Sequence, residues 1–342
     1  MRFGVWTPLP HTVPKPDLIP DMKVYGPGGA DDGTYLDFAV DVIGRADEFG
    51  FDVTLVAERF MGPDLESWIL ATTLAARTSR ITIMPAVHPG VMPPQVVAKL
   101  AMSLDRVSGG RAAINVVNGW WEDELQNYSN GQWLTDPEGR YRRMGEYMEV
   151  LHLLWSGEPA TFQGEYFQFT DTVLPMSPIS APPQIFGASS HDVGREAMAT
   201  FGDVWFLGPS GRATTLRAYD ADFDADLEYI RTETAAMKAA AESKGRSIQC
   251  GMAVMVVIGD TESEALEIVD TLDDFAARGF LEAVSVGGAA IFGTPERVVN
   301  RIEALSDAGV DLLMIKFAPM RNGLERFGTL VMPLLTGGAK AP

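Results

Sequence analysis

The residues most able to do chemistry in this chain follow one short apolar run. The stretch from Gly109 to Glu124 reads GGRAAINVVNGWWEDE, a glycine turn and an apolar run followed by a loop with an asparagine, two tryptophans and three acids. A buried strand that ends in a polar, aromatic loop is how α/β enzymes present an active site. The alternative is a core strand followed by an ordinary surface loop.

Other candidate side chains stand at the expected ends of further apolar runs. They are Glu58, Arg59, His88, Asn115 to Asn118, Ser189, Ser190, Met255 and Lys316. The histidines show no metal-ligand spacing such as His-x-x-x-His, so no metal site is expected. No Gly-x-Ser-x-Gly elbow is present, and the single cysteine, Cys250, begins an expected strand, which disfavours covalent hydrolase chemistry. Polar and aromatic side chains at the strand ends instead suit the binding of a large cofactor that supplies the chemistry of the reaction.

Two segments could bind the phosphate of such a cofactor. Ser189 and Ser190 precede an expected helix, where backbone N–H groups and hydroxyls can take a phosphate. Alternatively, Ser190 is a plain N-cap. Arg140 and Tyr141, at the start of another expected helix, could reach the same phosphate, although Arg140 could instead pair with a neighbouring carboxylate.

Apolar periodicity alternates between strands and helices along the chain. Strands are expected at 2–7, 51–57, 81–87, 112–117, 184–187, 203–207, 250–258 and 311–317. Helices are expected at 36–48, 67–77, 94–107, 139–155, 190–201, 222–244, 261–277, 295–308 and 324–335, with a hairpin at 161–173. This alternation predicts an α/β fold, a single-domain (β/α)8 TIM barrel with insertions over residues 1–342. A doubly wound sheet is disfavoured because no Gly-x-Gly-x-x-Gly follows the first strand.

The composition excludes several kinds of partner. Hydrophobic residues make up 46% and charged residues 21%, and no apolar run is long enough to span a membrane, so a soluble globular protein is expected. The formal net charge of −19 would repel nucleic acid and anionic lipid surfaces. One cysteine and an N-terminus without a signal-peptide pattern favour the cytoplasm.

Taken together, these segments resemble the bacterial-luciferase-like, flavin-dependent monooxygenases over nearly the whole chain. The motifs that carry the resemblance are Ser79 to Ile83, LDRVSGGR (104–111), NVVNGWWEDE (115–124), RYRR (140–143), FGASS (186–190) and FGTPERVVNRI (292–302). Within the family, the chain looks most similar to the branch of dimethyl sulfone, alkanesulfonate and ring-opening pyrimidine monooxygenases.

The resemblance implies a barrel that binds reduced FMN, which a separate NAD(P)H-dependent flavin reductase supplies, with O2 as cosubstrate, in a homodimer or homotetramer. The FMN contacts that it assigns to this chain are Asn115, Glu124, Arg140, Tyr141 and Ser190, and Arg59 falls where that branch has a basic residue beside the flavin. Ser189 is added to these candidate cofactor contacts because of its place before the expected helix. Glu58 departs from the family, which has an apolar residue beside Arg59. His88 and Asn118 are the candidates for polarising the substrate or a peroxide.

The substrate is expected to be small and neutral, such as a sulfone, an amide or a pyrimidine-like heterocycle. The sulfonate enzymes carry an arginine and a histidine on the seventh strand, where this chain has Ala253 and Met255. Burying a sulfonate without a cation would be costly. Trp120, Trp121 and Met255 are expected to line the substrate pocket, although the two tryptophans could instead anchor their loop.

The family's long lid before Phe292 is expected to be shortened to about residues 278–291, or replaced by the loop at 8–33. Two other functions stay open from the sequence. One is a deazaflavin-dependent oxidoreductase, which shares this barrel. The other is a flavin-binding protein without turnover.

Overall fold

The computed structural model describes residues 1–9, 34–62, 64–118, 122–208, 210–211, 215–277 and 289–335. Trp120, Trp121 and most of the two expected lid segments lie outside these residues. Their predicted roles therefore stay predictions.

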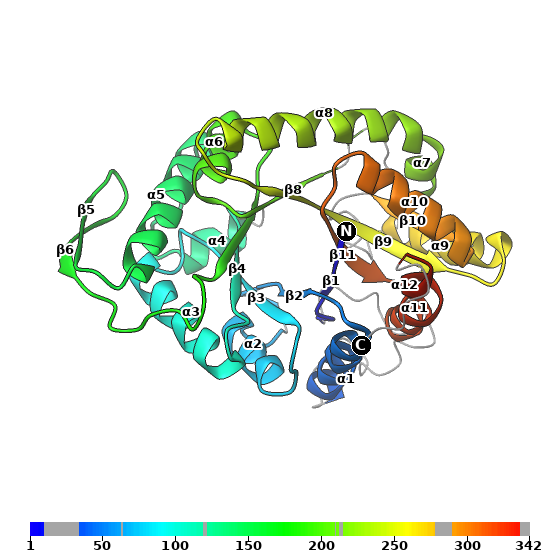
Figure 1. Cartoon of the computed structure of the whole chain (residues 1–342), viewed down its shortest axis with the longest axis horizontal. Coiled ribbons are helices and arrows are strands. Elements are labelled where there is room, and N and C mark those ends of the chain that lie inside the picture. The colour runs from blue at the N-terminus through cyan, green and yellow to red at the C-terminus, as the bar shows by residue number, and fades with distance from the viewer. Residues whose placement is uncertain are drawn as a thin grey trace.

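Parallel strands close into a barrel. Around the barrel the strands follow the order β9 (Gln249–Ile258), β11 (Leu312–Phe317), β1 (Arg2–Trp6), β2 (Val53–Val56), β3 (Thr82–Val87), β4 (Ala113–Val116), β7 (Gln184–Ala188) and β8 (Val204–Leu207). Strand β8 pairs again with β9, which closes the ring, and Figure 1 shows the helices outside it. The predicted (β/α)8 barrel is confirmed, and each expected strand overlaps a barrel strand.

The outer layer also follows the sequence closely. The helices between barrel strands include α1 (Thr34–Phe49), α2 (Ser67–Ala75), α3 (Pro94–Ser108), α5 (Pro137–Trp155), α6 (Asp192–Phe201), α8 (Phe223–Glu242), α9 (Glu262–Ala277) and α10 (Pro295–Asp307). The C-terminal helix begins earlier than expected and has three parts, α11 (Met320–Arg326), the π-helical turn η2 (Phe327–Val331) and α12 (Met332–Leu335). The expected hairpin is β5 (Ala160–Gln163) with β6 (Gln168–Thr172).

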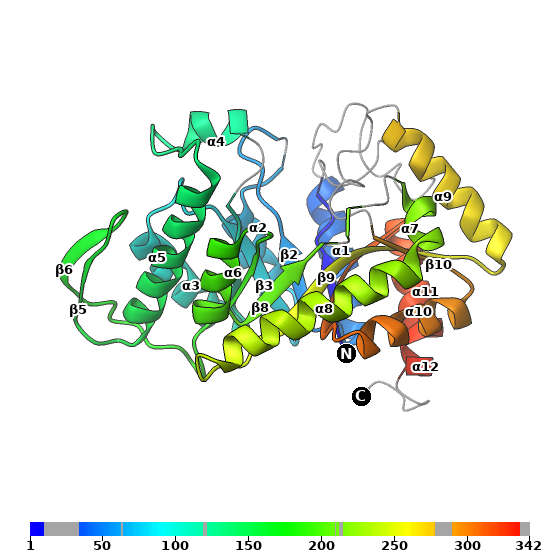
Figure 2. The same ribbon diagram turned by 90° about the horizontal axis from the view of Figure 1, so that it is seen from above.

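Three short elements were not expected from the sequence. They are α4 (Glu122–Tyr128), α7 (Leu216–Ala221) and β10 (Ala290–Gly293), which extends the sheet beside β9. Each is too short to show a helical or strand period of its own. In Figure 2, α4 lies at the top of the view, and the N-terminus, where β1 begins, lies toward the bottom. Helix α4 therefore covers the end of the barrel at which the parallel strands finish.

The interior of the barrel is filled with side chains. The inward-facing core consists of Val53, Leu55, Met84, Ala113, Phe186, Val204, Leu312 and Met314. On β1, Gly4 leaves room for this core, because a Cβ there would lie 2.2 Å from Met314 Sδ. Trp6 and Phe206 are only partly buried and pack against the core. A ligand must therefore bind above this layer, at the C-terminal ends of the strands.

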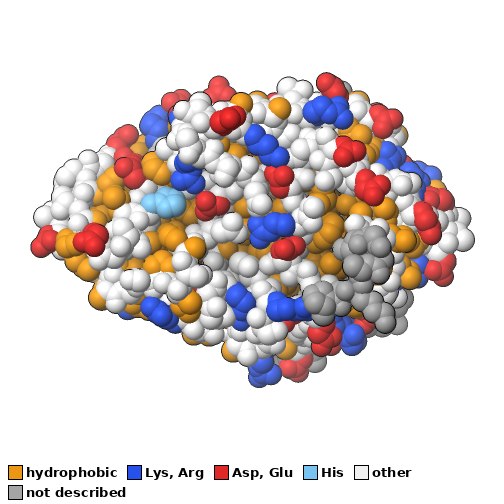
Figure 3. Space-filling model, viewed as in Figure 1, with side chains coloured by type: hydrophobic (Ala, Val, Ile, Leu, Met, Phe, Trp, Pro, Cys, Tyr) orange, Lys and Arg blue, Asp and Glu red, His pale blue; other side chains and the backbone are white. Residues whose placement is uncertain are grey.

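None of the helices within the described ranges is long and apolar enough to cross a membrane. On the face that Figure 3 shows, acidic and basic side chains are interspersed. The net charge of −19 is therefore not gathered into one acidic field on that face.

Asp47, near the end of α1, fixes the chain where it approaches β3. Its carboxylate accepts hydrogen bonds from the backbone N–H groups of Ser79 (2.9 Å), Arg80 (2.8 Å) and Ile81 (2.6 Å). Partial burial raises the pKa of Asp47, but these hydrogen bonds outweigh it, and the pKa lies below its ordinary value. These hydrogen bonds give the Ser79-Arg80 motif a structural role, because they fix the position at which β3 begins. His88 follows the opposite end of β3.

Asp47→Ala is expected to reduce the free energy of unfolding by about 3 kcal/mol, because it removes several hydrogen bonds to one charged acceptor. Since the native pKa is lowered, this stabilisation is present above the unfolded pKa and is lost as the pH falls through the native pKa. Urea unfolding at neutral pH measures the effect, with the exposed neighbour Glu48→Ala as the control. Equal effects of the two substitutions would contradict the assignment.

Candidate active site

Near the mouth of the barrel, the amide of Asn115 and the amine of Lys316 lie close to the C-terminal ends of their strands. Asn115 lies two residues after the inward-facing Ala113, and Lys316 lies two residues after Met314, so both side chains face the interior. Asn115 pairs in register with Ala86 on β3 and Phe186 on β7. It is almost fully buried. The structure therefore places the predicted cofactor contact Asn115 near the C-terminal end of β4, beside Phe186.

Lys316 is a buried amine that the sequence suggested only as a strand end. Its Nζ lies 4.1 Å from the centre of the Trp6 ring, a cation–π contact. Burial lowers the pKa of Lys316 to about 7. The amine is therefore divided between its charged and neutral forms near neutral pH. A lysine within the otherwise apolar strand LLMIKF was the signal in the sequence.

Met255 and Cys250 lie on the same long strand but in different places along it. Met255 is buried and pairs in register with Lys316, at the catalytic end of the barrel. Cys250 lies at the start of β9, and burial raises the pKa of its thiol to about 12. The expectation that Cys250 is no activated nucleophile is therefore supported by its position and protonation state. Among the described residues, no group of three His, Cys, Asp or Glu could hold a metal ion.

Arg59 and Glu124 form an ion pair that ties the loop after β2 to α4. Arg59 Nε lies 2.8 Å from Glu124 Oε2, and the side chains are 15% and 6% exposed. The neighbouring Glu58 has a different role, because its carboxylate accepts a hydrogen bond of 2.8 Å from the backbone of Ser67 at the start of α2. Burial raises the pKa of Glu58, and the hydrogen bonds with Ser67 oppose this. The residue that departs from the family thus supports a helix terminus.

His88, just after β3, is buried and uncharged at neutral pH. Burial lowers its pKa to about 4, although the charge of Glu124 and a hydrogen bond with the Val117 backbone oppose the shift. Its Nδ1 has no hydrogen-bond partner within the part of the chain that the structure describes. The ring also packs edge-on against Phe60, with centroids 5.7 Å apart. His88 can therefore donate or accept one hydrogen bond as a neutral imidazole.

Acid is expected to destabilise the protein through His88. The unfolded histidine binds a proton near pH 6.5 and the native one only near pH 4, so stability rises with pH across this window. Lowering the pH from 6.5 to 4 should remove up to about 3 kcal/mol. Unfolding measured at several pH values should show a shallower dependence for His88→Gln. His191→Gln, at an exposed histidine, should show the same dependence of the unfolding free energy on pH as the wild type. The same pH dependence in all three proteins would refute the prediction.

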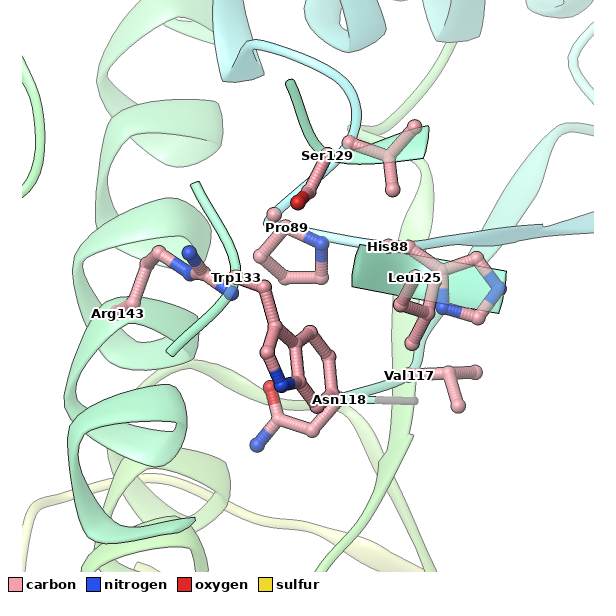
Figure 4. Close-up of a pocket in the computed structure, with 10 residues that line it drawn as sticks. His88, Pro89, Val117, Asn118, Leu125, Ser129, Trp133 and Arg143 are labelled. Carbon is pink, nitrogen blue, oxygen red and sulfur yellow. The ribbon is translucent and has the colours of Figure 1, made fainter. Parts of the chain in front are cut away.

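His88 and Asn118 line one small cavity at the ends of β3 and β4, as Figure 4 shows. The remaining lining residues are Pro89, Gly90, Val91, Val117, Leu125, Ser129, Trp133 and Arg143. The two candidate polarising residues, chosen separately from the sequence, are thus brought together. Trp133 and Arg143 were not predicted as site residues, although Arg143 ends the RYRR motif.

The two segments predicted to bind phosphate meet at the start of α6. Tyr141, from α5, packs against His191 with ring centroids 5.0 Å apart. Ser189 Oγ accepts a hydrogen bond of 3.1 Å from the His191 backbone N–H. Gly194 allows this approach, because a Cβ there would lie 2.2 Å from Ser189 Oγ and 2.3 Å from Tyr141 Cδ1. The exposed Ser190 precedes the N-cap, His191, so the alternative that Ser190 is the N-cap is wrong.

Arg140 is held by the backbone of its own loop. Its Nη1 donates to the carbonyl oxygens of Leu134 (2.7 Å) and Thr135 (3.2 Å), and its guanidinium lies 4.7 Å from the centre of the Trp133 ring. The ion pairs with the neighbouring carboxylates are made by Arg142, which lies 3.0 Å from Glu138. The position of Arg140 beside Tyr141 is compatible with the predicted contact to phosphate.

Comparison with known proteins gives a consistent result. The family model for luciferase-like monooxygenases matches residues 1–312. An FMNH2-dependent dimethylsulfone monooxygenase from Pseudomonas putida is 29% identical over 326 residues, which cover 85% of each chain. The pyrimidine monooxygenase RutA from Allorhizobium ampelinum is 30% identical and covers 86% of this chain and 87% of its own.

A solved structure shows the same fold at low sequence identity. The crystal structure of the long-chain alkane monooxygenase LadA has a TM-score of 0.79 and 17% identity, with 98% of this chain and 91% of that chain covered. The barrel and its added elements are therefore those of a known architecture.

Proposed function

This chain belongs to the luciferase-like monooxygenases, and we propose that it uses reduced FMN and O2 to oxygenate, and to cleave, a small neutral substrate such as a sulfone, an amide or a pyrimidine-like heterocycle. The family and the monooxygenase activity of its relatives support a flavin-dependent monooxygenase. The meeting of Tyr141 and Ser189 at the start of α6 is the structural observation that supports FMN most directly.

The described residues fit the phosphate of FMN. Gly194 keeps the space beside Ser189 and Tyr141 open, and a Cβ would fill that space. The first backbone N–H groups of α6 and the Ser190 hydroxyl add hydrogen-bond donors, and the start of a helix favours a negative charge. Arg140 would supply a positive charge from the neighbouring loop.

The barrel mouth fits the flavin ring. Trp6 and Phe206 offer apolar aromatic surface, and Asn115 offers one amide. Arg59 and Glu124 are proposed as further contacts from the rim. Reduced FMN, when bound, supplies the electrons that activate O2. The residues of this chain hold the reactants together and exclude water.

The chemistry of the mouth supports a neutral substrate. On β9 the two positions that are basic in the sulfonate enzymes are Ala253 and Met255. Lys316 pairs in register with Met255 on this strand. With a pKa of about 7, its amine carries only part of a positive charge at neutral pH. His88 is neutral, so together with Asn118 it can polarise a carbonyl or sulfonyl oxygen through hydrogen bonds.

The proposal extends to partners and location. A separate NAD(P)H-dependent flavin reductase would supply the reduced FMN, and the chain would work in the cytoplasm as a homodimer or homotetramer. Coupling purified chain to such a reductase, and determining its mass in solution, would test these points.

The decisive experiment measures O2 consumption with chemically reduced FMN and follows product formation. Neutral sulfones, amides and pyrimidines are expected to give oxygenated product, whereas methanesulfonate, a charged control, should give only hydrogen peroxide. FMN binding without product from any neutral substrate would support a flavin-binding protein without turnover. Turnover with a reduced deazaflavin, and none with FMN, would support the deazaflavin-dependent alternative.

A further inference from the structure

The cavity beside His88 contains hydrogen-bond donors for which no described residue supplies an acceptor. Arg143 Nε, Trp133 Nε1 and Asn118 Nδ2 are all buried and have no hydrogen-bond partner among the described residues. Figure 4 shows the Trp133 side chain between those of Arg143 and Asn118. Arginine and indole nitrogens can only donate, so a ligand that satisfies them must accept.

Arg143 also brings a positive charge to this cavity that no described carboxylate neutralises. The residue is 6% exposed, and its Nη1 donates to the Gln132 carbonyl at 2.5 Å. Burial lowers its pKa, as does the nearby Arg140, and Tyr166 opposes this shift. A buried cation without a counter-ion is costly unless a ligand supplies the negative charge.

The backbone is shaped so that the guanidinium can reach the cavity. A Cβ at Gly90 would lie 2.5 Å from Arg143 Nη2 and 3.0 Å from Arg143 Cζ. A side chain at residue 90 would therefore displace the guanidinium from its present position. The carboxylate that acts on His88, Glu124, is bound by Arg59, which reduces its repulsion of an anion.

We propose that this cavity, lined by His88, Asn118, Trp133 and Arg143, binds one small oxyanion of the carboxylate or sulfinate type. The oxyanion accepts hydrogen bonds from Arg143 Nε and Trp133 Nε1, and its charge is matched by the guanidinium. The Ser129 hydroxyl is buried in the same wall and donates a long hydrogen bond of 3.4 Å to the Gln126 carbonyl. The cavity is small and partly open to solvent, which restricts a ligand to a few heavy atoms. The anion would share His88 and Asn118 with the neutral substrate of the proposed function, so it would compete with that substrate for the same cavity. Its binding does not depend on FMN.

Calorimetric titration of the purified chain without FMN tests the site, with formate and methanesulfinate as the probes at constant ionic strength. Both anions should bind and raise the midpoint of thermal unfolding. Formamide and dimethyl sulfone, their neutral counterparts, should bind at least about tenfold more weakly, because they lack the charge. FMN binding and O2 consumption are measured separately, so failure of this site and failure of the proposed function can be distinguished.

Matched variants identify the residues that bind the anion. Arg143→Met should weaken formate binding at least about tenfold, whereas Arg142→Met, its exposed neighbour on α5, should bind like the wild type. Trp133→Phe keeps the aromatic ring and removes one donor, so a smaller loss is expected even if Arg143→Met folds poorly. Equal binding of formate and formamide, or no effect of either cavity substitution, would overturn the proposal. So would inorganic phosphate that binds more tightly than formate and is displaced by FMN, because the cavity would then belong to the flavin site.

Discussion

Gly194→Ala is expected to weaken FMN binding by about 100-fold, which corresponds to about 2.7 kcal/mol. The new Cβ would lie 2.2 Å from Ser189 Oγ and 2.3 Å from Tyr141 Cδ1, so both side chains must move from the start of α6. The charged phosphate would then lose at least one of its hydrogen bonds. A hydrogen bond to a charged group contributes about 1.5–3 kcal/mol. Fluorescence titration with FMN measures the dissociation constant directly.

The control for this prediction lies on the helix that faces α6. A Cβ at Gly145, in α5, would lie 3.5 Å from Ala197 Cβ, an ordinary contact. Gly145→Ala should therefore leave FMN affinity unchanged. Alanine favours a helix by about 1 kcal/mol over glycine, so no loss of stability is expected at Gly145, whereas the gain at Gly194 is offset by the close contacts there. Wild-type FMN affinity in Gly194→Ala would show that the phosphate binds elsewhere.

Glu124→Leu is expected to reduce the free energy of unfolding by about 3–5 kcal/mol, or to release α4 locally at a similar cost. The substitution removes one member of a buried ion pair and leaves Arg59 without its 2.8 Å partner. Because the negative charge of Glu124 raises the pKa of His88, its loss should lower that pKa further. Urea unfolding, together with hydrogen exchange of residues 122–128, separates global from local loss.

The double variant Arg59→Met/Glu124→Leu isolates the ion pair. Since it removes both charges, it should be more stable than Glu124→Leu alone, and the cycle should give a coupling free energy of about 1 kcal/mol or more. Glu124→Gln keeps the shape and removes only the charge, so it should lie between the wild type and Glu124→Leu. Additive effects of the two single substitutions would show that the pair does not hold α4.

The order of strands and helices could be predicted because its signals are local. The run of apolar residues in β4 and the alternating aromatic residues of the hairpin β5–β6 each specify an element within a few residues. Eight such strands that alternate with helices leave few arrangements other than a closed barrel. The resemblance added residue assignments, which stay predictions, and the structure places Tyr141 and Ser189 on either side of Gly194.

The sequence by itself determined the barrel, the end of it at which the site is expected, and the segments that contribute polar groups. Hydrophobic periodicity and the order of strands and helices can be read from residues that are close together in the chain. Only the tertiary structure decided which of these groups meet. Lys316 contacts Trp6 because β11 pairs with β1 when the barrel closes. Helix α4 is held across the rim by the Arg59–Glu124 pair, and the Arg143 guanidinium lies against Gly90 beside the cavity of His88. These contacts depend on how distant segments pack, and no local pattern records that packing.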